Sequence, residues 1–251
     1  MTVKEFYEYM CRALPSELSL DGDSDGLSVC PEPEREVKNV LIALDATAEI
    51  VEEAASEGYD VILTHHPMLF GGISAVNAEE YRGNKIVKLV RAGVSVMSFH
   101  TRLDAVDGGV NDMLASLLGL KNVSKIGEKG IARIGDLETP MLADDLAVFI
   151  KDTLVAPYVE FSDTGKLIKK VAVLGGSADS MIGDAIAAGA DALIGGELKY
   201  HALTDSTDYG ICLFSAGHFF TEAPVCAKLF ELCATVDIIP TISFSNRIRT
   251  V

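Results

Sequence analysis

Short apolar segments that are typical of buried strands alternate with helical segments along almost the whole chain, and this alternation constrains the fold more than any other feature. Strands are expected at residues 37–44, 60–64, 94–99, 131–137, 158–161, 170–174, 192–194, 211–215 and 238–244. Helices are expected at residues 3–14, 48–58, 79–92, 109–118, 141–154, 181–188, 199–203 and 219–234. This order predicts an α/β protein with a three-layer α/β/α arrangement, in which mixed, largely parallel sheets carry helices on both faces.

A polar stretch at residues 121–129 interrupts the alternation and predicts a border between two lobes. We expect one α/β lobe to contain residues 1–125 and 205–251. The second α/β lobe is expected to contain residues 126–204.

Acidic residues greatly outnumber basic ones. Lys and Arg total 21 and Asp and Glu total 37, so the formal charge is 21 − 37 = −16. A chain with this charge repels a phosphate backbone, which argues against direct nucleic-acid binding. The first ten residues carry charges throughout, and no uncharged run reaches the length of a membrane span. We therefore expect a cytoplasmic protein that does not bind membranes.

The five cysteines are odd in number, form no Cys-x-x-Cys pair and mostly lie in apolar stretches. This pattern predicts reduced, buried thiols, as expected in the cytoplasm. The residues are Cys11, Cys30, Cys212, Cys226 and Cys233.

Four of the five histidines follow the carboxyl end of an expected strand, which is the edge where α/β sheets bind ligands. His65 and His66 end the second strand, directly before Pro67. Neighbouring side chains on a strand point to opposite sides, so this pair is better placed to approach two metal ions than to chelate one. His100 and His218 follow two other strands.

Carboxylates accompany two of these histidines at a spacing of four residues. Asp104 follows His100, and the alternative reading of Asp104 is an N-cap for the helix expected at 109–118. Glu222 follows His218, and the alternative there is a local hydrogen bond within the first helical turn. Their positions after strands favour metal ligands in both cases.

Five side chains are thus candidate metal ligands, and all five fall in the lobe formed by residues 1–125 and 205–251. They are His65, His66, Asp104, His218 and Glu222. Three imidazoles and two carboxylates suffice for two divalent ions per chain if Glu222 bridges them, and this donor set suits zinc, iron, manganese or nickel. Water between two ions about 3.5–4 Å apart is a nucleophile at neutral pH, so the expected chemistry is hydrolytic.

Glu197 and His201 are also four residues apart and follow another strand. They are candidates for proton transfer or for supporting a metal ligand, with a salt bridge at the start of a helix as the alternative. His100 is a third candidate for proton transfer. The glycine turn at residues 173–179 matches neither a dinucleotide-binding nor a Walker motif, and is interpreted as a tight turn.

Six motifs together resemble the NIF-three-like dinuclear metal centre proteins, whose members are often named GTP cyclohydrolase I type 2 homologues. The motifs are GLSV (26–29), VLIALDAT (40–47), LTHHP (63–67), HTRLD (100–104), GGELKYH (195–201) and GHFFTE (217–222). The resemblance runs from about residue 20 to the end of the sequence. Arg102, Ala178 and Cys30 depart from the family pattern, which usually has Asn, Gly and Gly there.

The resemblance implies a two-lobed α/β protein that assembles into a hexameric toroid with the metal pair facing its cavity. It assigns the same five ligands, with Glu222 bridging and His100 close by. The short length matches the family form without an inserted domain.

Two functions remain open at this point. The first is a metal-dependent hydrolase, with GTP or a related nucleotide or phosphoester as the small-molecule substrate implied by the resemblance. The alternative is a non-enzymatic, metal-loaded hexameric ring that binds a protein partner or serves as a regulatory module.

Overall fold

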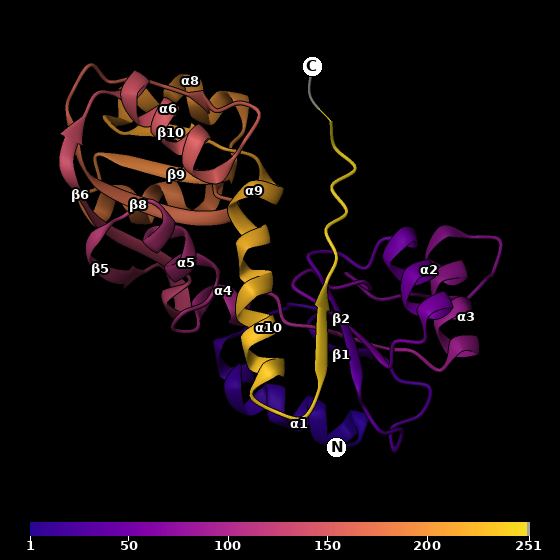
Figure 1. The fold of residues 1–251 in the computed structure, drawn as a ribbon. Coiled ribbons are helices and arrows are strands. Elements are labelled where there is room, and N and C mark those ends of the chain that lie inside the picture. The colour runs from indigo at the N-terminus through magenta and orange to yellow at the C-terminus, as the bar shows by residue number, and fades with distance from the viewer. Residues whose placement is uncertain (250–251) are drawn as a thin grey trace. The chain divides into compact units, whose positions relative to one another are not determined.

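The computed structural model describes residues 1–249 of the chain (Figure 1). These residues form two compact units. The first comprises Met1–Leu103 and Val225–Ile248, and the second comprises Asp104–Pro224. Each unit contains one mixed β-sheet with its own helices, which confirms the predicted α/β class.

The sheet of the first unit has the strand order β1-β4-β3-β2-β11. Its strands are β1 (Gly26–Val29), β2 (Asn39–Ala43), β3 (Val61–Thr64), β4 (Ser95–Ser98) and β11 (Ile239–Ile242). Pairing is parallel from β4 through β3 and β2 to β11, and β1 is antiparallel to β4. The carboxyl ends of β2, β3 and β4 therefore share one edge of the sheet, and the chain enters β1 at that same edge.

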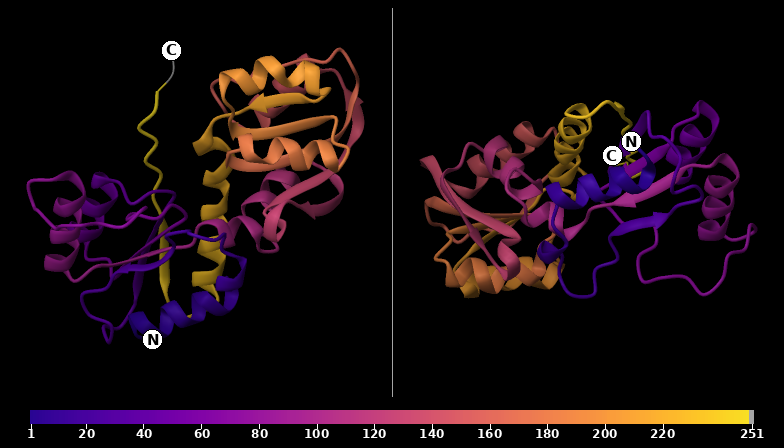
Figure 2. Two further views of the ribbon diagram at one scale, coloured as in Figure 1. Left: turned by 180° about the vertical axis from the view of Figure 1, so that it is seen from behind. Right: turned by 90° about the horizontal axis from the view of Figure 1, so that it is seen from below.

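Four helices of eight or more residues pack in the first unit. They are α1 (Val3–Ala13), α2 (Ala48–Glu57), α3 (Tyr81–Ala92) and α10 (Cys226–Ala234). Thr2 begins α1 with a capping box, and the left-handed residues Gly58 and Gly93 end α2 and α3. Figures 1 and 2 show α2 and α3 on one side of this sheet and α10 on the other.

The core of the first unit follows from the alternation of side chains along its strands. Apolar residues at every second strand position pack with the inner faces of α2 and α3. The central members of this cluster are Leu41, Ala43, Ile50, Val51, Ala54, Ile62, Leu89 and Val96. Buried residues of α10, which contacts β2 and β11, recur at the spacing of one helix face: Cys226, Leu229 and Cys233.

The sheet of the second unit has the strand order β5-β6-β8-β9-β10-β7. Its strands are β5 (Lys121–Ile126), β6 (Ala132–Met141), β7 (Glu160–Phe161), β8 (Ile168–Ser177), β9 (Ala192–Glu197) and β10 (Cys212–Ser215). The central strands β8, β9 and β10 are parallel, and the outer pairs β5/β6, β6/β8 and β10/β7 are antiparallel. The three parallel strands again place their carboxyl ends at one edge.

Six helices occupy the segment from residue 101 to residue 222. They are α4 (Thr101–Ala105), α5 (Val110–Leu117), α6 (Ala143–Leu154), α7 (Ile182–Ala187), α8 (Tyr200–Tyr209) and α9 (His218–Glu222). Leu114 of α5 and Leu146 of α6 share one apolar cluster with Val171, Val173 and Phe214 of the strands. α7 contacts β9, and α8 contacts β10.

The two compact units differ from the lobes expected from the sequence. Residues 104–125 and 205–224 were expected in the first lobe, but they belong to the second unit. The reason is strand pairing, because β5 hydrogen-bonds to β6 and β10 hydrogen-bonds to β9.

The helix expected at residues 219–234 is divided in the structure. It consists of α9, a 3-10 turn at Ala223–Val225 and α10. Pro224 lies in the turn, and a proline disfavours helical geometry at the residue before it and removes one backbone donor.

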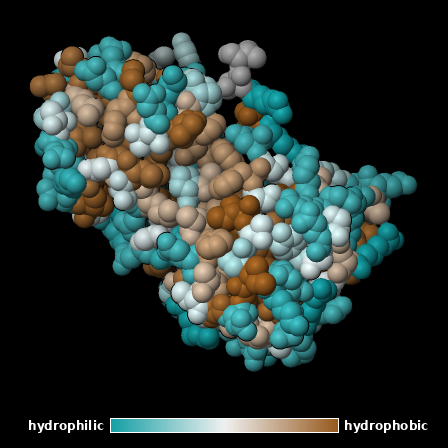
Figure 3. All heavy atoms as spheres, in the orientation of Figure 1, coloured by the Kyte–Doolittle hydropathy of each residue, from teal (hydrophilic) through white to brown (hydrophobic). Residues whose placement is uncertain are grey.

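None of the helices within residues 1–249 combines the length and apolar character that crossing a bilayer requires. In the face shown in Figure 3, hydrophilic residues dominate over α2 and α3 at the right. Hydrophobic residues are more frequent over the second unit at upper left.

Candidate metal centre

Three imidazoles meet at the carboxyl edge of the first sheet. His65 and His66 follow directly after β3, and His100 comes two residues after β4. One ring nitrogen from each lies within 4.8 Å of the other two. The ring centroids are 4.9 Å apart for His65 and His66, 5.2 Å for His65 and His100, and 5.8 Å for His66 and His100.

An oxygen atom contacts Nδ1 of each of the three rings. The partners are the backbone oxygen of Phe99 for His65 at 3.1 Å and the Asp45 carboxylate for His66 at 2.8 Å. The Asp23 carboxylate contacts His100 at 2.9 Å. Because a carbonyl or carboxylate oxygen accepts, these contacts assign Nδ1 as the donor in the neutral rings, so that a metal or a proton would bind at Nε2.

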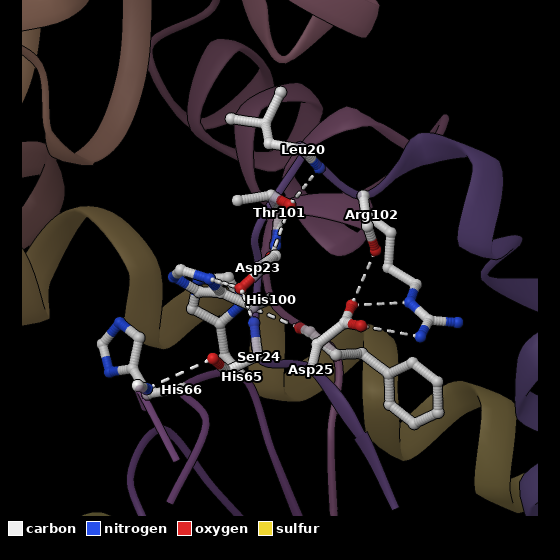
Figure 4. Close-up of polar contacts among 12 residues, drawn as sticks. Leu20, Asp23, Ser24, Asp25, His65, His66, His100, Thr101 and Arg102 are labelled. Carbon is white, nitrogen blue, oxygen red and sulfur yellow. Dashed lines mark hydrogen bonds and ion pairs between the residues drawn. The ribbon is translucent and has the colours of Figure 1, made fainter. Parts of the chain in front are cut away.

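Asp23 is held by three hydrogen bonds in the interior (Figure 4). Besides the His100 ring, its carboxylate accepts from the Thr101 amide at 3.1 Å and from the Thr101 hydroxyl at 2.6 Å. Burial would raise the pKa of Asp23, but the hydrogen bonds from His100 and Thr101 outweigh it and hold that pKa well below its usual value. Asp23 is therefore ionised at neutral pH.

Arg102 forms a second buried network beside this one. Its guanidinium donates to both oxygens of Asp25, at 2.6 and 2.8 Å, and to the Leu14 carbonyl at 2.9 Å. It also lies over the Phe99 ring, 5.0 Å from the centroid. Burial would lower the pKa of Arg102, but the bonds to Asp25 raise it. Arg102, one of the residues that depart from the family pattern, thus links the end of α1 to the segment before β1.

Asp45 is supported by a buried lysine on α3. Lys85 donates from Nζ to the carbonyl of Ala46, the next residue after Asp45, at 2.8 Å. Burial lowers the pKa of Lys85. This contact fixes the loop that carries the carboxylate partner of His66.

The carboxyl edge of the second sheet holds a histidine between two glutamates. His218 follows β10 and begins α9, and its Nε2 lies 2.9 Å from the Glu222 carboxylate one turn later. Its Nδ1 lies 3.5 Å from the carboxylate of Glu197, which ends β9. Glu222 is buried and Glu197 is exposed. The structure therefore brings these three predicted residues together.

Two glycines make room for α9 at this edge. A Cβ atom at Gly176 would lie 2.3 Å from Oε1 of Glu222 and 3.1 Å from Nε2 of His218. A Cβ atom at Gly196 would lie 2.7 Å from the Thr221 hydroxyl. The first glycine belongs to the segment interpreted from sequence as a tight turn, and its absent side chain allows the close approach of the two metal-ligand candidates.

Asp104 is buried within α4. It is not the N-cap of the next helix, because that position is Gly109. The Gly108 amide there donates to the Asp112 carboxylate at 2.7 Å. The N-cap interpretation of Asp104 is therefore wrong.

His201 lies in a different environment from Glu197. It is exposed near the start of α8 and lines a cavity of about 350 Å³ with Asp179, Tyr209, Ile182, Gly183, Ile186 and Ala202. Neither Glu197 nor His218 is among these lining residues. Glu197 and His201 therefore do not line the same cavity, although they are only four residues apart in the sequence.

The sequence analysis missed Asp23 and Asp45, which contact two of the imidazoles. Asp45 comes two residues after β2, so the rule that ligands gather at strand ends would have found it. Asp23 precedes an antiparallel strand, and only the register of β1 with β4, in which Gly26 pairs with Ser98, explains why it reaches His100.

The donors in both units fit a borderline divalent cation. Imidazole and carboxylate groups bind zinc and related ions at about 2.0–2.2 Å, and every donor here is nitrogen or oxygen.

The reduced state expected for the cysteines agrees with the structure. All five carry free thiols, and Cys212, Cys226 and Cys233 are buried. Burial raises the pKa of Cys226 and of Cys233 to about 12.

Comparison with known proteins connects this geometry to one family. A sequence profile described as Duf34/NIF3 (NGG1p interacting factor 3) matches residues 1–244. A "GTP cyclohydrolase 1 type 2 homolog" of Clostridium perfringens is 35% identical over 224 residues, which cover 86% of this chain and 85% of that protein. A protein of the same name from Methanocaldococcus jannaschii is 31% identical over 243 residues, covering 95% and 97%.

Solved structures show the same fold. A hypothetical protein of Staphylococcus aureus superimposes with a TM-score of 0.89 at 26% identity and covers 100% of this chain and 99% of its own. Reduced HcgD from Methanocaldococcus jannaschii superimposes with a TM-score of 0.85 at 27% identity and covers 96% and 97%.

Proposed function

Because this chain belongs to the Duf34/NIF3 family, we propose that it is a divalent-metal-dependent hydrolase that acts on a nucleotide or another phosphoester. The observation that carries the proposal is the cluster of His65, His66 and His100, in which an oxygen contacts Nδ1 of every ring. This arrangement is typical of metal-binding histidines, because the acceptor fixes the tautomer and the direction of Nε2. The name of the relatives supports GTP as a substrate to test.

The proposed centre holds two ions through the side chains identified from the sequence. These are His65, His66, Asp104, His218 and Glu222, with Glu222 as the bridging ligand. The buried carboxylate of Glu222 beside His218 supports the last assignment. Zinc, iron, manganese and nickel all accept this donor set.

Bound metal would supply a Lewis acid and would lower the pKa of a coordinated water. The chain itself carries 37 acidic against 21 basic residues, so a phosphorylated substrate needs that positive charge to approach the site. Glu197 is placed to orient His218 through its Nδ1, because the two groups lie 3.5 Å apart. His100 is the candidate for proton transfer at the first sheet.

The first experiment is elemental mass spectrometry of purified protein, before and after anaerobic reconstitution with each of the four metals. We expect a ratio of ~2 ions per chain that falls well below ~1 in Glu222→Ala. The matched control is Glu231→Ala, an exposed glutamate on α10, which should keep the ratio of the unmodified chain. Unchanged stoichiometry in Glu222→Ala would contradict the bridging role.

Activity is tested on the reconstituted protein with GTP and with bis(p-nitrophenyl) phosphate. We expect hydrolysis that disappears on chelation and in both Glu222→Ala and His66→Ala. Hydrolysis that survives both substitutions would contradict the proposal, as would a metal-loaded protein that turns over neither probe nor any member of a broad phosphoester panel.

We also propose that the chain forms a homo-hexamer. In the alternative, non-enzymatic function, this ring would bind a protein partner. Large apolar side chains exposed in the second unit support an assembly: Leu142, Val148, Val155 and Leu167. Light scattering coupled to size-exclusion chromatography tests this, with a mass near six chains of 26.8 kDa expected and a monomer contradicting it.

A further inference from the structure

An exposed aromatic ring lies beside the imidazole cluster of the first sheet. Phe70 comes shortly after His66 in the sequence, and its side chain is 59% exposed. Its ring lies edge-on to that of His100, with the centroids 6.5 Å apart and the ring planes at 81°. An edge-on neighbour covers at most one face of a ring, so a flat aromatic surface is open to solvent next to the candidate metal centre.

The backbone that carries Phe70 is fixed, although its side chain is not buried. Residues 69–72 form a hydrogen-bonded turn with Phe70 in second place. The third residue, Gly71, has φ of +75°, as the third position of a type II turn requires. Its amide donates to the Ser24 hydroxyl at 3.3 Å, and the Arg82 guanidinium donates to the Phe70 carbonyl at 3.4 Å. The ring therefore stands at the tip of an anchored turn.

One of these anchors also supports the imidazole cluster. Ser24 directly follows Asp23, whose carboxylate contacts the His100 ring at 2.9 Å (Figure 4). One short segment thus contacts both the turn of Phe70 and the ring of His100, and it fixes the position of one relative to the other.

The residues just before Phe70 pack in the core of the first unit, and Phe70 does not. Met68 is a buried member of the core cluster, and Leu69 packs against that cluster, whereas Phe70 has no part in it. Single exposed apolar side chains are common on protein surfaces. This ring differs from them because its backbone is anchored and because it borders three imidazoles.

An aromatic surface suits the part of a nucleotide that metal ions do not hold. The chain carries 37 acidic and 21 basic residues, so its own charge does not attract a phosphorylated ligand. A nucleobase is uncharged, and any base can stack on an aromatic side chain because every base has a π face. The His100 ring separates Phe70 from His65 and His66, much as the sugar of a nucleotide separates its base from its phosphate.

We propose that Phe70 is the platform on which the nucleobase of the substrate stacks, so that the site prefers nucleotides to phosphoesters without an aromatic group. This inference rests on the hydrolase proposed above and names the substrate class of that site. The base covers the open face of the Phe70 ring, and the phosphate points toward the imidazole cluster.

A fluorescence experiment tests the contact itself. The chain contains no tryptophan, so Phe70→Trp introduces a single indole at the tip of the turn. Tyr158→Trp is the matched control, because it introduces the indole at an exposed aromatic position of the second unit. The zinc-reconstituted full chains are titrated with GMP and with ribose 5-phosphate, which lacks the base. We expect GMP to cause a saturable loss of emission in Phe70→Trp and none in Tyr158→Trp, and ribose 5-phosphate to cause none in either variant.

A binding experiment tests the energetic contribution of the ring. Phe70→Leu removes the π face and keeps an apolar side chain, whereas Phe70→Tyr keeps the π face. In isothermal titration of the zinc-reconstituted chains, we expect Phe70→Leu to weaken GMP binding by about 5–100-fold. The affinity for ribose 5-phosphate and the zinc ratio should not change, and Phe70→Tyr should bind GMP as the unmodified chain does.

Several results would overturn the inference. One is GMP affinity that is equal in Phe70→Leu and the unmodified chain, and another is emission of Phe70→Trp that does not respond to GMP. Loss of zinc from Phe70→Leu would make the ring a support of the metal centre, and a change of molecular mass in light scattering, with GMP binding unchanged, would make it a subunit contact. Failure of the unmodified, zinc-loaded chain to bind GMP would also overturn the inference.

The hydrolase and the stacking platform fail in different ways. If GMP binding depends on Phe70 but the zinc-loaded protein hydrolyses no probe, the hydrolase alone is contradicted. If bis(p-nitrophenyl) phosphate is hydrolysed but GMP binding does not depend on Phe70, the hydrolase stands and the platform is contradicted.

Discussion

The backbone of Gly176 and the carboxylate of Glu222 are in direct contact, so close that a Cβ atom on the glycine would lie 2.3 Å from Oε1. Gly176 also has φ of +69°, a region that residues with a Cβ atom rarely adopt. The end of β8 thus determines where the proposed bridging ligand can lie.

Gly176→Ala should displace the Glu222 carboxylate and weaken metal binding by about 10-fold or more. The control is Gly189→Ala, which has φ of +75° but open space around the new Cβ atom. Both substitutions should cost about 1 kcal/mol in the free energy of unfolding from backbone strain, and Gly176→Ala should cost more because its Cβ atom also collides with Glu222. Isothermal titration with zinc distinguishes them, and equal zinc affinities would show that the close contact does not position Glu222.

Stability should fall in acid partly through Asp112. Burial would raise the pKa of this carboxyl, but hydrogen bonds from Arg133 and from the Gly108 amide lower it. A folded pKa below the unfolded value of about 3.9 means that the native state binds the proton more weakly. The stabilisation that ionised Asp112 contributes is therefore fully present above the unfolded pKa and is lost as the pH falls through the folded pKa.

Asp112→Asn should lower the free energy of unfolding by about 2–4 kcal/mol at pH 7, because Arg133 is buried and loses its carboxylate partner. The difference from the unmodified chain should shrink below about pH 4. Urea titrations at pH 7, 5, 4 and 3 measure it. Asp107→Asn removes an exposed pair with Lys125 and serves as the control, and a difference for Asp112→Asn that does not vary with pH would contradict the assignment.

Thiol reactivity should distinguish Cys11 and Cys30 from Cys226 and Cys233. Cys226 and Cys233 are buried on α10 with pKa values raised to about 12, so almost no thiolate is present at pH 8. Iodoacetamide should label the partly exposed Cys11 and Cys30 in the native protein and reach the α10 pair only after unfolding. Peptide mass spectrometry locates the label, and rapid native labelling of Cys233 would show that α10 opens readily.

Helices that end at a glycine were predictable from the sequence, because the capping residue lies directly beside the helix that it ends. Gly58 and Gly93 end α2 and α3 where the sequence indicated, each in a left-handed conformation. β5 was read as a polar border because it is the edge strand of its sheet, and an edge strand with exposed side chains shows no apolar alternation. Its pairing with β6 depends on the partner strand, which the segment itself does not reveal.

The candidate metal ligands were proposed from the sequence because each lies on the segment that follows the carboxyl end of a strand, a position that is visible in the sequence. The partners of the imidazoles were harder to find. Asp23 and His100 are 77 residues apart, and their contact depends on an antiparallel register that no local pattern encodes. The five metal ligands expected from the sequence remain a prediction to be tested by metal stoichiometry.

The parallel pairing of β11 with β2 has a consequence for biosynthesis. β2 is made early, yet the neighbour that covers its outer edge, Ile239–Ile242, is translated only after the whole of Asp104–Pro224 has been made. A growing chain on the ribosome therefore carries an incomplete first sheet with an open, apolar edge while the second unit already has all its strands. The order of translation thus favours completion of the second unit first. The unfinished first sheet is then the part of the nascent chain that most needs chaperones to protect it.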